Sequence, residues 1–448
     1  MRTPPAPAAA IWTVAPAAIW TLGGHARHQT PRTAGTGWRR LAHWAAGARD
    51  SCRPLRAGSA RFPRLVGDRG RARPPAGRRN YYVLGIETSC DDTAVALYDR
   101  HSPTEPPRLL AERRESLDNR AAGGIIPTSA LAHHQIHIGA LVQQVLAEGG
   151  IRPDVVCATR GPGMVGSLSA GLQFAKGLAV AWQVPLVGVH HMLGHLLTPR
   201  LATNGAGPRF PFATVLVSGG HTQVVLSTSL TEHRVVAETL DVAIGDMLDK
   251  CARALGLVGN MLGVELERFV GELEADADAP AGTVVDGVDC TISLPRPLRN
   301  KPRRIDVDGF SFAPFITAVD TALAGLGGLQ ALTRRQRQVV ARQIQDAIFG
   351  HLAERTALAL AQAPDVRDVV VSGGVAANRR LRALLTAAVP AAELHFPPTA
   401  LCTDNAHMIA WAGIELYEAG YTTSLAAVPL RKWSLERLLD GVDDWQRA

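Results

Sequence analysis

The chain has 448 residues, of which 46% are hydrophobic, and its formal net charge is +7. This length is enough for two or three domains with sizeable cores. Polar residues interrupt the longest apolar stretches, so no membrane span is expected. The six cysteines form no C-x-x-C pair, so reduced thiols are expected rather than a disulfide framework.

The positive charge belongs to an N-terminal segment, residues 1–80. It holds fifteen arginines, no lysine and two acids, a net charge of +13, whereas the other 32 basic and 38 acidic residues sum to −6. The overall basic balance is therefore no argument for nucleic-acid binding by the body of the chain. An arginine-rich segment with so few acids predicts a mitochondrial presequence, and hence a protein of the mitochondrial matrix. A disordered basic arm that binds nucleic acid is the alternative.

The first half of the folded part, residues 81–207, alternates apolar strand-like runs with helical ones. A strand and its hairpin partner open it, and strand–helix units follow. The predicted strands cover 82–86, 94–98, 155–159 and 185–189, and the predicted helices cover 130–148 and 167–182.

The second half, residues 208–448, repeats the same pattern of strand, glycine turn and strand. Strands are predicted over 212–217, 222–226 and 369–371, and helices over 338–361 and 406–417. A segment at about 271–304, acidic and then basic, is expected to be an insertion. The repeat predicts an α/β protein with two duplicated lobes, and ligands usually bind in the cleft between such lobes.

Two glycine turns follow apolar strands in this second half. They read Val-Ser-Gly-Gly-His-Thr at 217–222 and Ser-Gly-Gly-Val-Ala-Ala-Asn at 372–378. Consecutive backbone N–H groups in such a turn can face a phosphate, and glycine permits close approach and positive φ. Asn378 can bind a base or ribose through its paired donor and acceptor. A plain structural turn, or a helix N-cap at Asn378, remains the alternative.

His191 and His195 have the i, i+4 spacing that places two imidazoles on one helix face. With Asp404 as a third ligand they would leave open positions on Zn²⁺ or Fe²⁺. A structural histidine pair is the alternative. A zincin protease needs Glu directly after the first His, and Met192 stands there.

Acidic residues complete the candidate site. Asp91 follows the first strand, where it could take a proton from an incoming nucleophile or simply form a hairpin turn. Asp249, on a predicted helix, could bind ribose hydroxyls beside Gly263. The alternative for Asp249 is a solvated surface pair with Lys250.

These motifs together resemble the threonylcarbamoyl transferase family that modifies transfer RNA, once called glycoprotease, and in particular its mitochondrial branch. The resemblance runs from about Tyr82 to about Tyr417. It rests on ordered motifs at 85–93, 161–168, 190–195, 216–223, 245–250, 310–312, 372–378 and 402–405.

The resemblance implies an actin-like ATPase fold, as in sugar kinases, and one divalent metal ion per subunit bound by His191, His195 and Asp404. It implies that threonylcarbamoyl-AMP, made by an upstream synthase, is bound by Val217, Ser218, Gly219, Gly220, His221, Asp249, Gly263 and Asn378. The group would pass to N6 of adenosine 37 in transfer RNAs that read codons beginning with A, with Asp91 assisting deprotonation. A homodimer is compatible with this reading. A non-catalytic nucleotide-binding scaffold and, less favoured, a metalloprotease are the alternatives.

Several positions depart from the family pattern. Leu193 stands where Glu is usual, Ala313-Pro314 replaces a small residue followed by Gly, and Ile316 replaces Lys or Gln. The spacing before Gly263 also differs by one residue. We expect the loss of Glu at 193 to weaken the support of the metal ligands.

The net charge of residues 81–448 is negative, so transfer RNA is expected to bind through local basic patches that contact its phosphates. The candidates are the arginine-rich segments 296–304, 334–342 and 379–382. For the second segment, a solvated helix face is an equal alternative.

Overall fold

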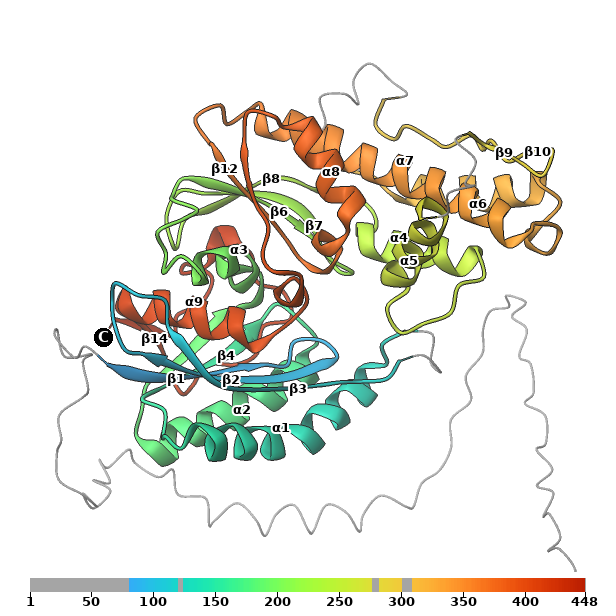
Figure 1. The fold of residues 1–448 in the computed structure, drawn as a ribbon. Coiled ribbons are helices and arrows are strands. Elements are labelled where there is room, and N and C mark those ends of the chain that lie inside the picture. Colours follow the sequence, from blue (N-terminus) through green and yellow to red (C-terminus); the bar gives the residue numbers. More distant parts are fainter. Residues whose placement is uncertain (1–79, 120–123, 276–281, 300–307, 448) are drawn as a thin grey trace, which may run out of the picture. The chain divides into compact units, whose positions relative to one another are not determined.

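The computed structural model describes residues 80–119, 124–275, 282–299 and 308–447, and residues 69–448 group into one compact unit. Apart from Asn80, the expected presequence lies outside the described residues. Two mixed β-sheets and the helices that cover them make up this unit (Figure 1). No helix among the described residues is long and apolar enough to cross a membrane.

The first sheet has the strand order β3-β2-β1-β4-β5. Its first three strands form an antiparallel meander, and β4 and β5 continue parallel to β1. Two long helices, α1 and α2, pack on one face through an apolar cluster that includes Leu84 and Leu172. The bounds are β1 Tyr81–Glu87, β2 Asp92–Arg100, β3 Arg108–Ser116, α1 Pro127–Gly149, β4 Val155–Gly161, α2 Val165–Trp182 and β5 Leu186–His190.

The second sheet repeats this arrangement. Leaving aside the two-residue edge strand β11, its order β8-β7-β6-β12-β13 and its strand directions match those of the first sheet. The strands are β6 Phe212–Val217, β7 Thr222–Ser227, β8 His233–Thr239, β11 Gly309–Phe310, β12 Asp368–Ser372 and β13 Glu393–His395. This duplication confirms the α/β fold with two lobes and the actin-like class that the resemblance implied.

Helices α4 to α8 cover the outer face of the second sheet around Phe269 and Phe349. Their bounds are α4 Ile244–Ala254, α5 Leu262–Glu274, α6 Ala313–Gly325, α7 Arg334–Leu360 and α8 Arg379–Ala388. A capping box at Thr333 starts α7 earlier than the predicted 338. The expected start of the insertion, residue 271, lies inside α5. Beyond it the described residues form a short hairpin, β9 Val284–Val285 and β10 Val288–Asp289.

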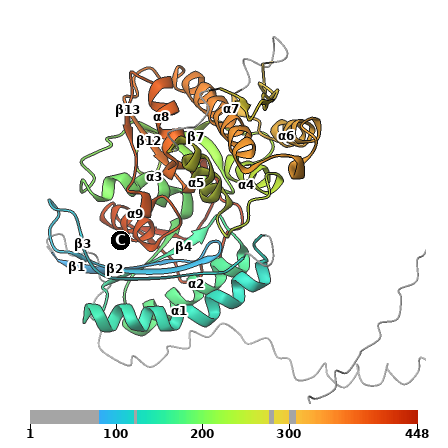
Figure 2. The ribbon, with the colours of Figure 1, turned by 45° about the vertical axis from the view of Figure 1, so that its right-hand side comes forward.

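Two further helices, α3 (His191–Leu201) and α9 (Ala406–Glu418), lie between the sheets (Figures 1 and 2). They share one apolar cluster with Val83 of the first sheet and Phe212 of the second. α9 follows the second sheet in sequence but packs closely on the first. A Cβ at Gly85 would lie 2.6 Å from the carbonyl oxygen of Ala406, so this approach requires glycine.

The C-terminal residues are tied to the first sheet by an ion pair whose arginine is buried. The Arg160 guanidinium donates to both carboxylate oxygens of Asp444, at 2.5 and 2.7 Å. Neighbouring residues form the small sheet of β14 (Tyr421–Thr423) and β15 (Trp445–Arg447). Short 3-10 helices complete the described residues at Leu329–Ala331, Gly374–Ala377, Thr399–Leu401 and Leu435–Arg437.

Candidate functional site

The histidine pair lies at the start of α3, which begins directly after β5. The His190 side chain caps the helix by accepting a hydrogen bond from the Met192 backbone N–H at 3.1 Å. One helical turn then separates His191 from His195, and their ring centroids are 4.9 Å apart at 87°. The predicted i, i+4 arrangement on one helix face is therefore present.

Asp404 reaches both histidines from the loop before α9. Its Oδ1 lies 3.5 Å from Nε2 of His191 and 3.2 Å from Nε2 of His195. Ligand atoms of the three residues all fall within 4.8 Å of one another. Asn405 fixes the loop by capping α9, accepting from the Met408 backbone N–H at 2.9 Å. The structure thus brings Asp404 to two histidines that lie more than two hundred positions earlier in the chain.

Glu87 supports this cluster from the end of β1. Its carboxylate is fully buried, and its Oε2 lies 3.3 Å from Nδ1 of His191. The Ser89 hydroxyl lies 3.1 Å from the same nitrogen, and the Ser89 backbone N–H donates to Glu87 Oε1 at 2.5 Å. The Thr159 hydroxyl donates to Glu87 Oε2. Sequence reasoning quoted Glu87 within a motif but gave it no role. The sequence signal that could have identified Glu87 is an acidic residue at the end of an otherwise uncharged strand.

The buried charges of the cluster shift one another's protonation. Burial alone would lower the pKa of His191, but the carboxylates of Asp404 and Glu87 outweigh burial and raise it to about 9. Burial likewise opposes ionisation of Asp404, yet the two histidines hold its pKa well below the usual range. The nearby His221 stays neutral because burial lowers its pKa to about 4. The cluster therefore combines a carboxylate with a cationic His191 in the metal-free protein.

The donor set fits a divalent transition metal. Two imidazole nitrogens and one carboxylate are ligands that Zn²⁺ and Fe²⁺ accept, with positions left for water or substrate. Metal-bound histidines usually give their second ring nitrogen to a carboxylate or other polar group. His191 does this, since Nε2 faces Asp404 while Nδ1 contacts Glu87 and Ser89. His195 Nδ1 is buried without a hydrogen-bond partner among the described residues.

Asp91 lies in the turn between β1 and β2, so the hairpin position and the candidate site coincide. Its Oδ2 accepts a hydrogen bond from the Asn119 side-chain amide at 2.8 Å. Arg114 spans the same region, donating to Asp92 at 2.7 Å and to the hydroxyl of Thr403 at 3.0 Å. Sequence reasoning missed Asn119 and Arg114, because only the folded chain places them beside Asp91 and Asp404.

The turn at 217–222 differs from the anion nest that the sequence predicted. The Ser218 hydroxyl accepts from the backbone N–H groups of Gly220 at 3.3 Å and His221 at 3.0 Å, so these two donors are already bonded. Gly219 and Gly220 do not have positive φ, but both are exposed and face open space. Val217 ends β6 and is buried. The turn therefore offers room for a ligand, with fewer unbonded donors than expected.

The second turn uses glycine for a steric reason. Gly373 has φ of +99°, and a Cβ there would lie 2.4 Å from the carbonyl oxygen of Val217. Asn378 then caps α8, its Oδ1 accepting from the backbone N–H groups of Arg380 at 2.9 Å and Leu381 at 3.1 Å. The helix-cap alternative is thus confirmed for Oδ1, which leaves the amide group of Asn378 for a ligand.

Asp249 and Gly263 lie together as the sequence predicted. Asp249 Oδ1 accepts from the Gly263 backbone N–H at 3.0 Å, so the start of α5 faces this carboxylate. Burial raises the pKa of Asp249. The alternative pairing of Asp249 with Lys250 is wrong, because Lys250 donates to Asp246 at 2.8 Å.

The departures from the family pattern have local explanations. Leu193 is fully buried in the apolar cluster between the sheets, where an unpaired carboxylate would be costly. Pro314 lies in the first turn of α6, a position that tolerates proline. Ile316 packs against the core of the second lobe. The carboxylate contact to His191 comes from Glu87, so Leu193 does not remove it.

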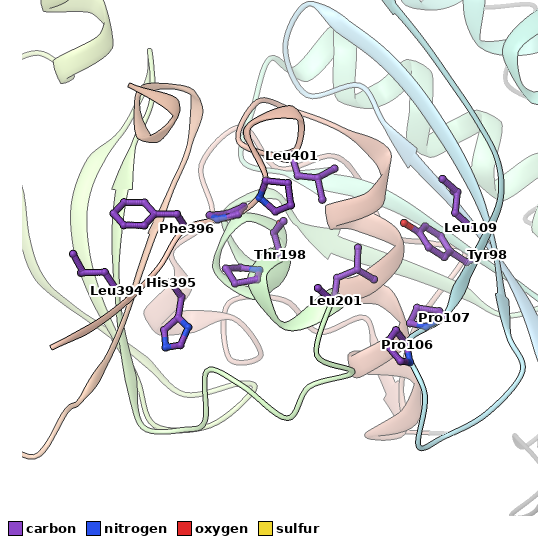
Figure 3. Close-up of a pocket in the computed structure, with 14 residues that line it drawn as sticks. Tyr98, Pro106, Pro107, Leu109, Thr198, Leu201, Leu394, His395, Phe396 and Leu401 are labelled. Carbon is purple, nitrogen blue, oxygen red and sulfur yellow. The ribbon is translucent and has the colours of Figure 1, made fainter. Parts of the chain in front are cut away.

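Two cavities border this part of the chain. The larger, about 530 Å³, lies between the β2–β3 connection and the segment after β13, with Thr198 and Leu201 of α3 between them (Figure 3). No candidate site residue lines it. The second, about 490 Å³, is lined by Ser116, Asp118, Val258, Gly259, Asn260 and Glu265.

Ion pairs partly neutralise the predicted basic patches. Arg299 pairs with Glu354, Arg334 with Glu272 and Arg380 with Asp346. Lys301, Arg303 and Arg304 lie outside the described residues. The patches therefore present less free positive charge than their sequences suggest.

The fold and the site define a class: a two-lobed α/β protein of the actin-like type with a buried His-His-Asp cluster. Comparison with known proteins gives the family. The model of the tRNA N6-adenosine threonylcarbamoyltransferase family matches residues 108–411. The chain belongs to this family.

Three relatives show the extent of the similarity. A mitochondrial tRNA N6-adenosine threonylcarbamoyltransferase of Schizosaccharomyces pombe is 34% identical over 82% of this chain and 89% of its own length. The enzyme of the same name from Burkholderia pseudomallei is 40% identical over 74% of this chain and 91% of its own. That of Sphingopyxis alaskensis is 37% identical over 80% and 97%.

Proposed function

We propose that this chain transfers the threonylcarbamoyl group from threonylcarbamoyl-AMP to N6 of adenosine 37, in mitochondrial transfer RNAs that read codons beginning with A. A carbon–nitrogen bond forms between the carbamoyl carbon and N6, the bond from that carbon to the phosphate oxygen breaks, and AMP leaves with its electron pair. N6 loses one proton. The observation that carries the proposal is the convergence of His191, His195 and Asp404, with Glu87 behind them, in a member of this family.

Each candidate residue has a role that suits its position. His191, His195 and Asp404 would hold one divalent metal ion, Zn²⁺ or Fe²⁺, which supplies Lewis-acid polarisation of the transferred group when bound. Glu87 orients His191 through its Nδ1. Asp91, held by Asn119, accepts the proton from the attacking amine.

The adenylate would lie across the second lobe. Gly219 and Gly220 leave open space beside the end of β6, where the phosphate would lie. Val217, Ser218 and His221 complete that turn. Asp249, with Gly263 against it, would bind ribose hydroxyls, and the Asn378 amide group would bind the nucleoside.

The proposed reaction needs a source of threonylcarbamoyl-AMP and a cellular location. A separate enzyme that forms threonylcarbamoyl-AMP from threonine, bicarbonate and ATP must supply it. The arginine-rich leader and the mitochondrial relative from Schizosaccharomyces pombe support a location in the mitochondrial matrix. A homodimer is part of the proposal and is tested by the mass of the particle in solution.

Transfer of labelled threonine to transfer RNA tests the proposal, with bicarbonate, ATP and the adenylate-forming enzyme supplied. We expect the wild type to form the modified nucleoside, detected by mass spectrometry, and His195→Ala and Asp404→Ala to lose it together with bound metal. Gln135→Ala, at an exposed position of α1, is the control. Retained transfer in both cluster variants contradicts the metal assignment. Tight nucleotide binding by the wild type without any transfer supports the non-catalytic scaffold instead.

A further inference from the structure

Hydrogen bonds through Asn119 link the smaller cavity to the candidate base, Asp91. Its lining comes from the end of β3, at Ser116 and Asp118, and from the loop that leads into α5, at Val258 to Glu265. Asn119 connects it to Asp91: the side-chain amide donates to Asp91 at 2.8 Å, and the backbone N–H donates to Asn260 Oδ1 at 2.9 Å. A ligand in this recess therefore contacts Asn260, which is hydrogen-bonded to the residue that holds Asp91.

The recess combines apolar and acidic groups. Val258 is 85% exposed, Met261 56% and Val264 52%, so the loop and the first turn of α5 present an unusual amount of apolar surface. Asp118 and Glu265 add carboxylates, and Arg268 pairs with only one oxygen of Glu265 in addition to Glu272. Carboxylates repel a phosphate and accept N–H groups, whereas an apolar rim suits the face of a base. This chemistry favours an unstacked base with an amino group over the phosphate of the adenylate.

Asn260 supplies the group that distinguishes adenine. An asparagine amide offers one acceptor and two donors, which match the amino group and an adjacent ring nitrogen of adenine. Its Oδ1 has two lone pairs, so it can accept from a base while the Asn119 N–H occupies one of them. On the edge that carries N7, guanine presents two acceptors, O6 and N7, and cannot make both bonds.

We propose that this recess binds the acceptor adenine of transfer RNA, with Asn260 as the specificity-determining residue and Val258 as an apolar contact to a base. The proposal rests on the proposed function and deepens it by placing the second substrate. The adenylate occupies the glycine-turn side of the site, and the acceptor base enters past Asp118 and Asn260, with its amine toward Asp91.

Steady-state kinetics with an anticodon stem–loop RNA test the placement. Val258→Asp adds a charge at an exposed position and leaves the core untouched, and Val284→Asp, at a valine 58% exposed on β9, is the matched control. We expect Val258→Asp and Asn260→Ala to raise the KM for RNA about ten-fold, which corresponds to about 1.4 kcal/mol. The dissociation constant of the adenylate and the thermal midpoint should stay at wild-type values. An unchanged KM for RNA in both variants, or a weakened adenylate affinity without a change in that KM, overturns the proposal.

Direct binding separates this proposal from the proposed function. Stem–loops with adenosine or guanosine at position 37 are titrated against the full chain without adenylate. We expect the wild type to prefer adenosine and Asn260→Ala to lose that preference, whether or not transfer occurs. A wild type that forms no modified nucleoside contradicts the proposed function alone. Equal affinity of the wild type for the two RNAs contradicts the adenine recess alone.

Discussion

Oε2 of Glu87 lies 3.3 Å from Nδ1 of His191, while the opposite ring nitrogen of that histidine faces Asp404 at 3.5 Å. The imidazole is therefore held between two carboxylates, one fully buried and one partly exposed. This contact fixes which ring nitrogen is presented to a metal ion. Glu87, at the end of β1, therefore belongs to the same cluster as the two histidines of α3 and Asp404 in the loop before α9.

We predict that Glu87→Gln weakens metal binding without removing a ligand. Loss of a carboxylate behind a metal-bound histidine typically lowers affinity about 10- to 100-fold. Competition between the purified protein and a zinc chelator at constant pH measures the change. Glu105→Gln, at an exposed acid outside the cluster, is the control. Equal zinc affinity in both variants would remove Glu87 from the centre.

Metal binding should also strengthen as pH rises. Because the pKa of His191 is raised to about 9, this histidine is protonated at neutral pH and must release a proton to bind metal. Zinc affinity should therefore increase from pH 7 to pH 8.5, measured by chelator competition in matched buffers. His191→Asn should abolish most of this dependence, and a flat profile in the wild type contradicts the prediction.

The same shift predicts how the stability of the metal-free protein changes with pH. The folded pKa of about 9 exceeds the unfolded value of about 6.5, so protonation of His191 favours the folded state. The contribution is complete below about pH 6.5 and is lost as pH rises through 9. Urea unfolding of chelator-treated protein should show this decline in wild type and a smaller one in His191→Asn.

The two glycine turns should respond differently to alanine. Gly373→Ala forces a Cβ against the Val217 carbonyl and a positive φ onto alanine, a cost on the order of 1–3 kcal/mol in the free energy of unfolding. Gly219→Ala meets nothing in the folded chain, so stability should be unchanged while adenylate affinity falls. Urea unfolding and adenylate titration of both variants separate the two effects. A stable Gly373→Ala protein counts against the steric reading.

Restoring the usual family residue at position 193 should harm this protein. Leu193→Glu places an unpaired carboxylate among apolar side chains, which costs on the order of 3–5 kcal/mol. Leu193→Met, similar in volume and apolar, should cost less than about 1.5 kcal/mol. Thermal and urea unfolding compare the two. Higher activity in Leu193→Glu at undiminished stability would contradict this prediction and would show that a glutamate at this position can support the metal ligands.

Much of the fold could be predicted from the sequence because most of its central strands are apolar runs, and two of them, β6 and β12, are followed by glycine turns. The strands at 82–86 and 212–217 and the helix at 338–361 were each found within a few residues of their observed ends. β3 was missed, since Arg108–Ser116 is largely exposed and charged and lies at a sheet edge. The packing of α9 on the first sheet was also beyond the sequence, because periodicity shows an apolar face but not its partner.

The candidate ligands could be predicted, but their surroundings could not. Spacing alone paired His191 with His195, whereas Asp404 was suggested by its residue type and by the family resemblance. Glu87 and Asn119 act through contacts across 104 and 28 positions of the chain, which no local pattern encodes. The sequence also did not show that the Ser218 hydroxyl accepts from two backbone N–H groups of the expected anion nest. Such side-chain hydrogen bonds depend on the backbone conformation of the turn.

The place of α9 has a consequence for how the protein is made. The helix that covers the inner face of the first sheet, and the aspartate that contacts the two histidines, both leave the ribosome more than two hundred residues after the last strand of that sheet. Until then the first half of the chain lacks a partner for an apolar surface that includes Val83 and Val187. Folding of the first lobe is therefore completed only after the second sheet has been synthesised, and a chain that stops before Thr403 loses the apolar packing on this face of the first sheet together with Asp404 of the His-His-Asp cluster.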